Sequence, residues 1–131
     1  VLSLGSAPVF FRSVKLKVVA RSSTETELMS LEDATTYVVW TQLLLNEMGI
    51  SQQKPTLIYQ DNKSTIHMAQ FGGNFKRTKH ILCKQMYVRE RIEKGEVVLK
   101  YCPTGDMIAD VFTKPLNKQF FLKFREKLGL E

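Results

Sequence analysis

Thr24-Glu25-Thr26-Glu27-Leu28-Met29-Ser30 marks the change from a strand-forming segment to a long helix. Upstream, residues 9–19 are rich in β-branched and aromatic side chains, which favours a strand. Downstream, apolar residues recur at helical spacing, as in the series Leu28, Leu31, Val38 and Leu45. Thr24 and Glu27 fit a capping box that would begin the helix. The stretch therefore predicts a strand, a turn, and a helix that carries Glu27 in its first turn.

The rest of the chain alternates strand and helix signals. Gly5-Ser6-Ala7-Pro8 is a turn signal between residues 1–4 and 9–19, which together predict a hairpin. Further strands are expected at residues 56–60 and 96–102, a helical turn at 106–113, and helices at 24–48, 62–70, 79–94 and 117–128. This order predicts an α/β fold with a mixed β-sheet flanked by helices.

Length and composition are those of one globular domain, residues 1–131. The net charge of +6 and the pI of about 9.4 favour a polyanionic partner, or else a solvated surface rich in lysine. No apolar run is long enough to span a bilayer, so we expect no membrane partner. Cys83 and Cys102 are too few for a disulfide scaffold, which indicates an intracellular protein of the cytoplasm or nucleus.

Three carboxylates lie at the edges of expected elements: Glu27 at the start of a helix, Asp61 after a strand, and Asp110 in a helical turn. Divalent ions that cleave phosphodiesters need hard oxygen ligands converging from several elements. The three residues are therefore candidate catalytic residues and ligands for Mg²⁺ or Mn²⁺. The alternatives are that Glu27 belongs to a capping box, that Asp61 caps the next helix, and that Asp110 is a surface residue.

A basic segment with neighbouring aromatics suits a nucleic-acid strand, because cations hold phosphates and aromatics stack on bases. The candidate nucleic-acid-binding residues are Lys76, Arg77, Lys79, His80, Asn62 and Lys84. The alternative is a solvated loop and helix start. Trp40 and the methionines are expected in the core.

Four stretches together resemble the ribonuclease H domain of Ty1/Copia-type retrotransposon (retrovirus-related) Pol polyproteins. They are residues 18–29, residues 58–64 with Tyr59-Gln60-Asp61-Asn62, residues 77–81, and residues 108–116 with Ile108-Ala109-Asp110. The resemblance implies an RNase H-like fold, two Mg²⁺ or Mn²⁺ ions, and cleavage of the RNA strand of RNA/DNA hybrids. It also implies that Glu27, Asp61 and Asp110 are the metal ligands.

The chain departs from the family pattern at its start. The family's first strand carries a further metal-binding Asp, whereas residues 1–4 resemble the second strand and residues 1–24 contain no Asp or Glu. We therefore expect an N-terminally truncated domain, cut from a longer protein, that lacks the usual first, central strand. The absence of that strand would leave the edges of two neighbouring strands unpaired.

Three functions follow from this pattern. The first is a hybrid-specific ribonuclease with weak or no turnover. The second is a catalytically dead, transposon-derived module that binds nucleic acid. The third is a protein-interaction module whose unpaired sheet edges bind a second copy, or another chain that supplies the missing strand.

The expected missing ligand gives a direct test of the first function. We expect the isolated chain to cleave an RNA/DNA hybrid weakly or not at all with Mg²⁺ or Mn²⁺, as followed by gel electrophoresis of a labelled RNA strand. A peptide that supplies the missing strand with its Asp should restore cleavage. Robust cleavage by the chain alone would contradict this expectation.

Overall fold

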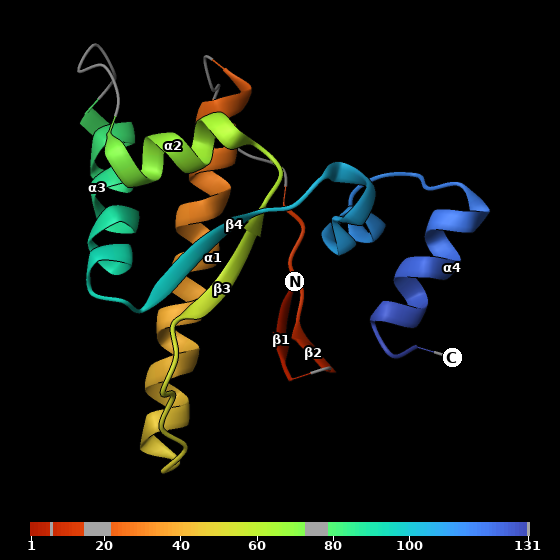
Figure 1. The fold of residues 1–131 in the computed structure, drawn as a ribbon, viewed down its shortest axis with the longest axis horizontal. Helices are drawn as coiled ribbons and strands as arrows, with labels where there is room; N and C mark the ends of the chain where they lie inside the picture. Colours follow the sequence, from red (N-terminus) through yellow and green to blue (C-terminus); the bar gives the residue numbers. More distant parts are fainter. Residues whose placement is uncertain (6, 15–21, 73–78, 131) are drawn as a thin grey trace. The chain divides into compact units, whose positions relative to one another are not determined.

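A computed structural model describes residues 1–5, 7–14, 22–72 and 79–130 (Figure 1). Along them the structure places strands β1 (Leu2–Leu4) and β2 (Ala7–Phe10), helix α1 (Ser23–Glu47), strand β3 (Thr56–Gln60), helices α2 (Lys63–Phe71) and α3 (Lys79–Glu93), strand β4 (Val97–Tyr101), the 3₁₀ turns η1 (Thr104–Asp106) and η2 (Ile108–Phe112), and helix α4 (Lys118–Lys127). This mixed α/β content confirms the predicted fold class and is consistent with an RNase H-like fold that lacks a strand. No helix within the described ranges is long and apolar enough to cross a membrane.

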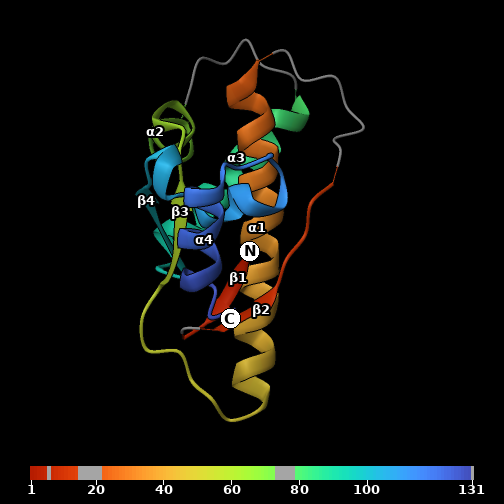
Figure 2. The same ribbon diagram turned by 90° about the vertical axis from the view of Figure 1, so that its right-hand side faces the viewer.

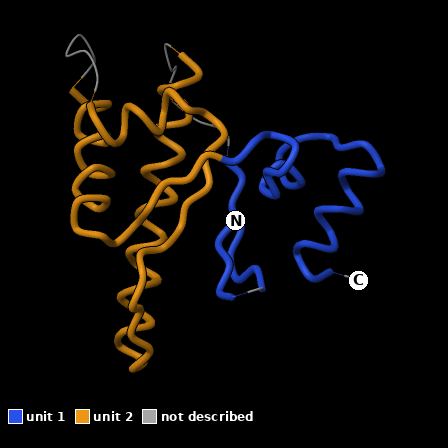
Figure 3. Tube along the Cα trace, in the orientation of Figure 1, with its two compact units in different colours: residues 1–17, 102–131 blue, residues 18–101 orange. Residues whose placement is uncertain are grey.

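The chain divides into two compact units (Figure 3). One consists of residues 18–101, and the other combines residues 1–17 with residues 102–131. The larger unit contains α1, β3, α2, α3 and β4. The smaller unit contains the hairpin of β1 and β2 together with η1, η2 and α4.

The larger unit is built on a parallel pair of strands. β3 pairs with β4 in a register that joins Thr56 to Val97 at one end and Gln60 to Tyr101 at the other. Parallel strands need a long crossover between them, which α2 and α3 provide. Helices α1 and α3 lie on one face of these strands (Figure 2). The bounds of β3 confirm the strand predicted at residues 56–60.

The core of this unit joins all three helices to β4. Its buried side chains are Leu28, Leu31, Met68, Ala69, Ile81, Val88 and Leu99. Leu28 and Leu31 are three residues apart, as are Ile66 and Ala69, which is the spacing that puts side chains on one helix face. The inward face of α3 consists of Ile81 and Val88, which are buried, and Ile92, which packs against the core.

Helix α1 begins earlier than the sequence pattern predicts. Ser22 is extended, with φ −153° and ψ 159°, and its Oγ accepts a hydrogen bond of 3.2 Å from the backbone N–H of Glu25. The predicted cap at Thr24 is therefore wrong. Ser22-x-x-Glu25 has the same local pattern two residues upstream, so the backbone conformation decides which residue caps. At the other end, Gly49 takes φ 77° and ends the helix as predicted.

The second half of α1 contradicts the prediction that Trp40 and the methionines are core residues. Trp40 is 60% exposed and Met48 is 64% exposed, whereas Met68 is buried. A helix of 25 residues is about 37 Å long, whereas a strand of five residues covers about 17 Å. The helix therefore extends beyond the strands it packs against.

The smaller unit contains an antiparallel hairpin. β1 pairs with β2, and the register shifts between Leu2 and Ser3. The second strand, predicted at residues 9–19, instead runs from Ala7 to Phe10, and residues 11–14 are not part of a strand. Residues 15–19 of the predicted strand lie outside the described residues. The Phe11 ring stacks on Phe112 of η2 with ring centroids 5.0 Å apart.

The end of the chain in this unit is held by a polar contact. Asn117 caps α4, because its Oδ1 accepts from Phe120 N–H at 2.9 Å. Lys123 Nζ donates to Asp106 Oδ1 at 2.7 Å, and this hydrogen bond lowers the pKa of Asp106.

Two leucines of α1 test which face of the helix is core. Leu28 is fully buried, whereas Leu43 is 62% exposed. We expect Leu28→Ala to lower the free energy of unfolding by about 2–5 kcal/mol, because it opens a cavity. The same change at Leu43 should cost less than about 1 kcal/mol. Urea denaturation followed by circular dichroism measures both, and equal losses would show that the core is assigned wrongly.

Candidate functional site

An open cavity of about 500 Å³ lies within residues 18–101. It forms where the starts of α1 and α2 meet the carboxyl ends of β3 and β4. Its lining residues are Ser23, Glu27, Asp61, Asn62, Lys63 and Tyr101. Two of the three predicted carboxylates, Glu27 and Asp61, are thereby brought to one cavity.

The structure removes the capping alternative for Glu27. Ser22 provides the helix cap, and Glu25 holds the position that the sequence pattern gave to Glu27. Glu27 instead lies further into the helix, directly before the fully buried Leu28. Packing of Leu28 in the core therefore fixes the backbone from which Glu27 reaches the cavity.

The capping alternative for Asp61 is also wrong, because its neighbour Asn62 is the cap of α2. Asn62 Oδ1 accepts hydrogen bonds from Ser64 N–H at 3.0 Å and from Thr65 N–H at 3.2 Å. The Asn62 N–H in turn donates to Gln60 Oε1 at 3.0 Å. Asp61 is thus held between two fixed residues while its own side chain lines the cavity.

A contact between the two helix starts keeps the cavity together. Thr65 of α2 is fully buried, and its Oγ1 donates to the backbone carbonyl of Thr24 at 3.5 Å. This bond joins the turn that carries Glu27 to the helix that follows Asp61.

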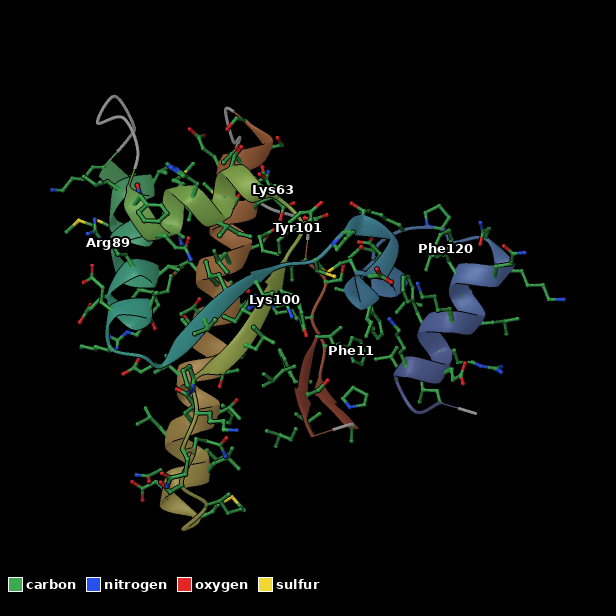
Figure 4. The ribbon with its side chains drawn as sticks, viewed as in Figure 1. Phe11, Lys63, Arg89, Lys100, Tyr101 and Phe120 are labelled. Atoms are coloured by element: carbon green, nitrogen blue, oxygen red, sulfur yellow. The ribbon has the colours of Figure 1, made fainter. Side chains whose placement is uncertain are left out.

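Sequence reasoning missed three residues of this cavity, Ser23, Lys63 and Tyr101. Lys63 Nζ lies 4.6 Å from the centre of the Tyr101 ring, and Figure 4 shows the two side chains together. Tyr101 ends β4 and is paired in register with Gln60. The two predicted strands could have indicated this position in the sequence, because the carboxyl ends of parallel strands meet at one edge of a sheet.

Asp110 belongs to the smaller unit. It is only 8% exposed, so the alternative of a surface residue is wrong. Its Oδ2 accepts from Lys114 Nζ at 3.0 Å. Within either unit, the described residues hold no group of three or more His, Cys, Asp or Glu side chains able to bind a metal ion. The convergence of Asp110 with Glu27 and Asp61 stays a prediction.

The cavity has a donor set suited to a hard cation. Mg²⁺ is commonly held by one or two carboxylates, with water and substrate phosphates completing the shell. Glu27 and Asp61 supply two carboxylates in an open space, and the Ser23 hydroxyl adds an oxygen at its wall. These residues therefore fit one Mg²⁺ or Mn²⁺ ion.

The predicted nucleic-acid-binding residues have different environments. Lys79 and His80 are exposed in the first turn of α3. Lys84 forms an ion pair with Glu32 of α1, and Asn62 uses its Oδ1 as a helix cap. Lys76 and Arg77 lie outside the described residues.

The chain is similar to retrovirus-related Pol polyproteins of transposons. The polyproteins of transposons RE1 and RE2 from Arabidopsis thaliana are each 33% identical to it over 130 residues, or 99% of this chain. That of transposon TNT 1-94 from Nicotiana tabacum is 27% identical over 122 residues, or 93% of the chain. The chain spans 9% of the length of each relative. No family model matches the chain, and no solved structure does either.

Substitutions of the adjacent residues Asn62 and Asp61 distinguish the helix cap from the candidate metal ligand. We expect Asn62→Ala to lower the free energy of unfolding by about 1 kcal/mol, because two backbone N–H groups lose their acceptor. The matched change Asp61→Ala should alter it by less than about 0.5 kcal/mol. Urea denaturation in metal-free buffer compares them. A larger loss for Asp61→Ala would mean that Asp61 has the structural role.

Proposed function

We propose that this chain is a ribonuclease H region of a retrotransposon Pol polyprotein, which acts inside the cell on the RNA strand of RNA/DNA hybrids. The supporting observation is the cavity that Glu27 and Asp61 both line while neighbouring residues, Ser22 and Asn62, supply the helix caps. Similarity to Pol polyproteins over 99% of the chain supports the same proposal.

In this proposal, Glu27 and Asp61 hold a divalent ion at the edge of the sheet. Such an ion, when bound, would supply an activated water for attack on a phosphodiester. The fixed helix starts orient the two carboxylates before substrate arrives, which lowers the cost of positioning them. Hybrid recognition would use duplex shape and 2′-hydroxyl groups rather than base sequence.

Asp110 is the proposed third ligand, as the family resemblance implies. We propose weak turnover for this chain by itself, because residues 1–24 contain no carboxylate to add to these three.

Metal binding tests the carboxylates without depending on turnover. We expect Glu27→Gln and Asp61→Asn each to weaken Mn²⁺ binding at least about tenfold, which corresponds to about 1.4 kcal/mol. The control is Glu47→Gln, which removes an exposed carboxylate at the far end of α1. Titration calorimetry measures the affinities, and loss of hybrid cleavage should accompany loss of metal.

The outcome also separates the enzyme from a catalytically dead module. If Asp61→Asn binds Mn²⁺ as well as the unchanged chain does, the proposed metal site is wrong. A purely nucleic-acid-binding role would then remain, with salt-sensitive hybrid binding that Asp61→Asn leaves unchanged.

A second candidate function is association through the sheet. Within the described residues, β3 and β4 pair only with each other, and a two-stranded sheet is marginally stable. Leu57, Tyr59 and Val98 are exposed, on the sheet face opposite to the buried Leu99. We propose that a second copy, or another chain that supplies the missing strand, pairs with this sheet.

Self-association has a simple readout. We expect light scattering over a concentration series to show a dimer whose population rises with concentration. Tyr59→Lys places a charge on the exposed face and should shift the chain towards monomer, whereas Lys54→Glu in the preceding loop should not. A strict monomer at all concentrations, with no strand-donating partner, would contradict this candidate.

A further inference from the structure

The cavity contains one basic side chain beside its two carboxylates. Of its six lining residues, only Lys63 carries a positive charge. The Lys63 ammonium lies 4.6 Å from the Tyr101 ring centre (Figure 4). This distance lies within the range of about 6 Å in which the face of an aromatic ring attracts a cation.

The backbone fixes both partners of this contact. Lys63 is the first residue of α2 and directly follows Asn62, which caps the helix with two hydrogen bonds. Tyr101 is the last residue of β4, where it pairs with Gln60. The ammonium is therefore anchored in the same edge of the sheet that carries Asp61.

Within the described chain, Lys63 contacts an aromatic ring and has no ion pair with a carboxylate, unlike four other lysines. Lys84, Lys94, Lys114 and Lys123 each contact a carboxylate, on Glu32, Glu90, Asp110 and Asp106 respectively. A carboxylate neutralises the charge of a lysine, whereas an aromatic ring holds the ammonium and leaves its net charge in place. Lys63 thus presents a charge that is restrained in position and is not held in a direct ion pair.

We infer that Lys63, restrained by Tyr101, binds a phosphate of a nucleic-acid strand next to Glu27 and Asp61. This inference rests on the proposed function and adds a substrate-positioning residue to it. The carboxylates of Glu27 and Asp61 repel the negatively charged phosphate of a substrate. The Lys63 ammonium in the same cavity offsets that repulsion. Lysine suits this role, because its ammonium is a compact charge with three donors, which can face a phosphate while it stays over the ring.

Salt dependence measures such a contact directly. Each phosphate contact releases counterions, so log Kd depends on log salt concentration with a slope set by the number of contacts. We expect Lys63→Met to reduce that slope by about 0.7–0.9 for an RNA/DNA hybrid in EDTA, as followed by fluorescence anisotropy. Lys63→Arg should keep the slope, because arginine retains the charge and the contact with the ring.

The matched control is Lys54→Met. Lys54 is exposed in the loop before β3, at the opposite end of that strand from Asp61. The change removes the same net charge from the same unit, so it reports any general electrostatic effect. We expect it to leave the slope nearly unchanged.

Variants of Tyr101 test the anchor. Tyr101→Phe keeps the ring and should bind the hybrid as the unchanged chain does. Tyr101→Leu should weaken binding about two- to fivefold, the range of an exposed cation–π contact. In the Lys63→Met background, Tyr101→Leu should have no further effect, because the two side chains then no longer act together.

The results distinguish this inference from the proposed function. A Lys63→Met slope equal to that of Lys54→Met, in a variant with an unchanged melting temperature, would overturn the role of Lys63. Independent effects of Lys63→Met and Tyr101→Leu would overturn the anchor. In either case, loss of Mn²⁺ binding in Asp61→Asn would leave the nuclease site standing. Failure of the unchanged chain to bind any hybrid would refute the proposed function, and Lys63 with it.

Discussion

The parallel register of β3 and β4 is the constraint on which the cavity depends. It pairs Gln60 with Tyr101, so that the two strands end at the same edge. The chain has to cross over between parallel strands, and the crossover places α2 directly after Asp61. At the other end of the pair, Gln42 of α1 donates to Thr56 Oγ1 at 2.9 Å and to the Glu96 carbonyl at 2.8 Å. One half-buried amide therefore fixes α1 against the starts of both strands.

The second organising feature is the set of neutral side chains that form hydrogen bonds with backbone N–H and carbonyl groups. Ser22 and Asn62 accept the backbone N–H groups at the starts of α1 and α2, where a helix leaves donors without partners. Gln85 is buried in α3 and donates to the Met68 carbonyl at 2.7 Å, which joins α3 to α2 within the core. Because neutral side chains perform these structural tasks, the carboxylates of Glu27 and Asp61 are placed at a solvent-open wall. A metal ion or a phosphate can reach them there.

Much of the fold could be predicted from local pattern. The strand at residues 56–60, the helix ends at Gly49 and Gly95, and the inward face of α3 all follow from spacing and glycine placement. The caps could not be predicted in the same way. Ser22 and Thr24 both precede a glutamate by three residues, and Asp61 and Asn62 are both good caps. The choice between them depends on the residue at which each helix begins. Tertiary packing of Leu28 and Thr65 determines that residue.

The sequence by itself determined the order of the elements, the basic character of the chain, and the carboxylates that any metal-dependent chemistry would need. Hydrophobic period and turn residues act over a few neighbours, so they can be read without coordinates. Only the tertiary structure brought Glu27, Asp61, Lys63 and Tyr101 to one cavity, because Tyr101 lies 40 residues beyond Asp61 and reaches it through strand pairing. Such pairing depends on packing across the whole unit, which no local stretch of sequence specifies.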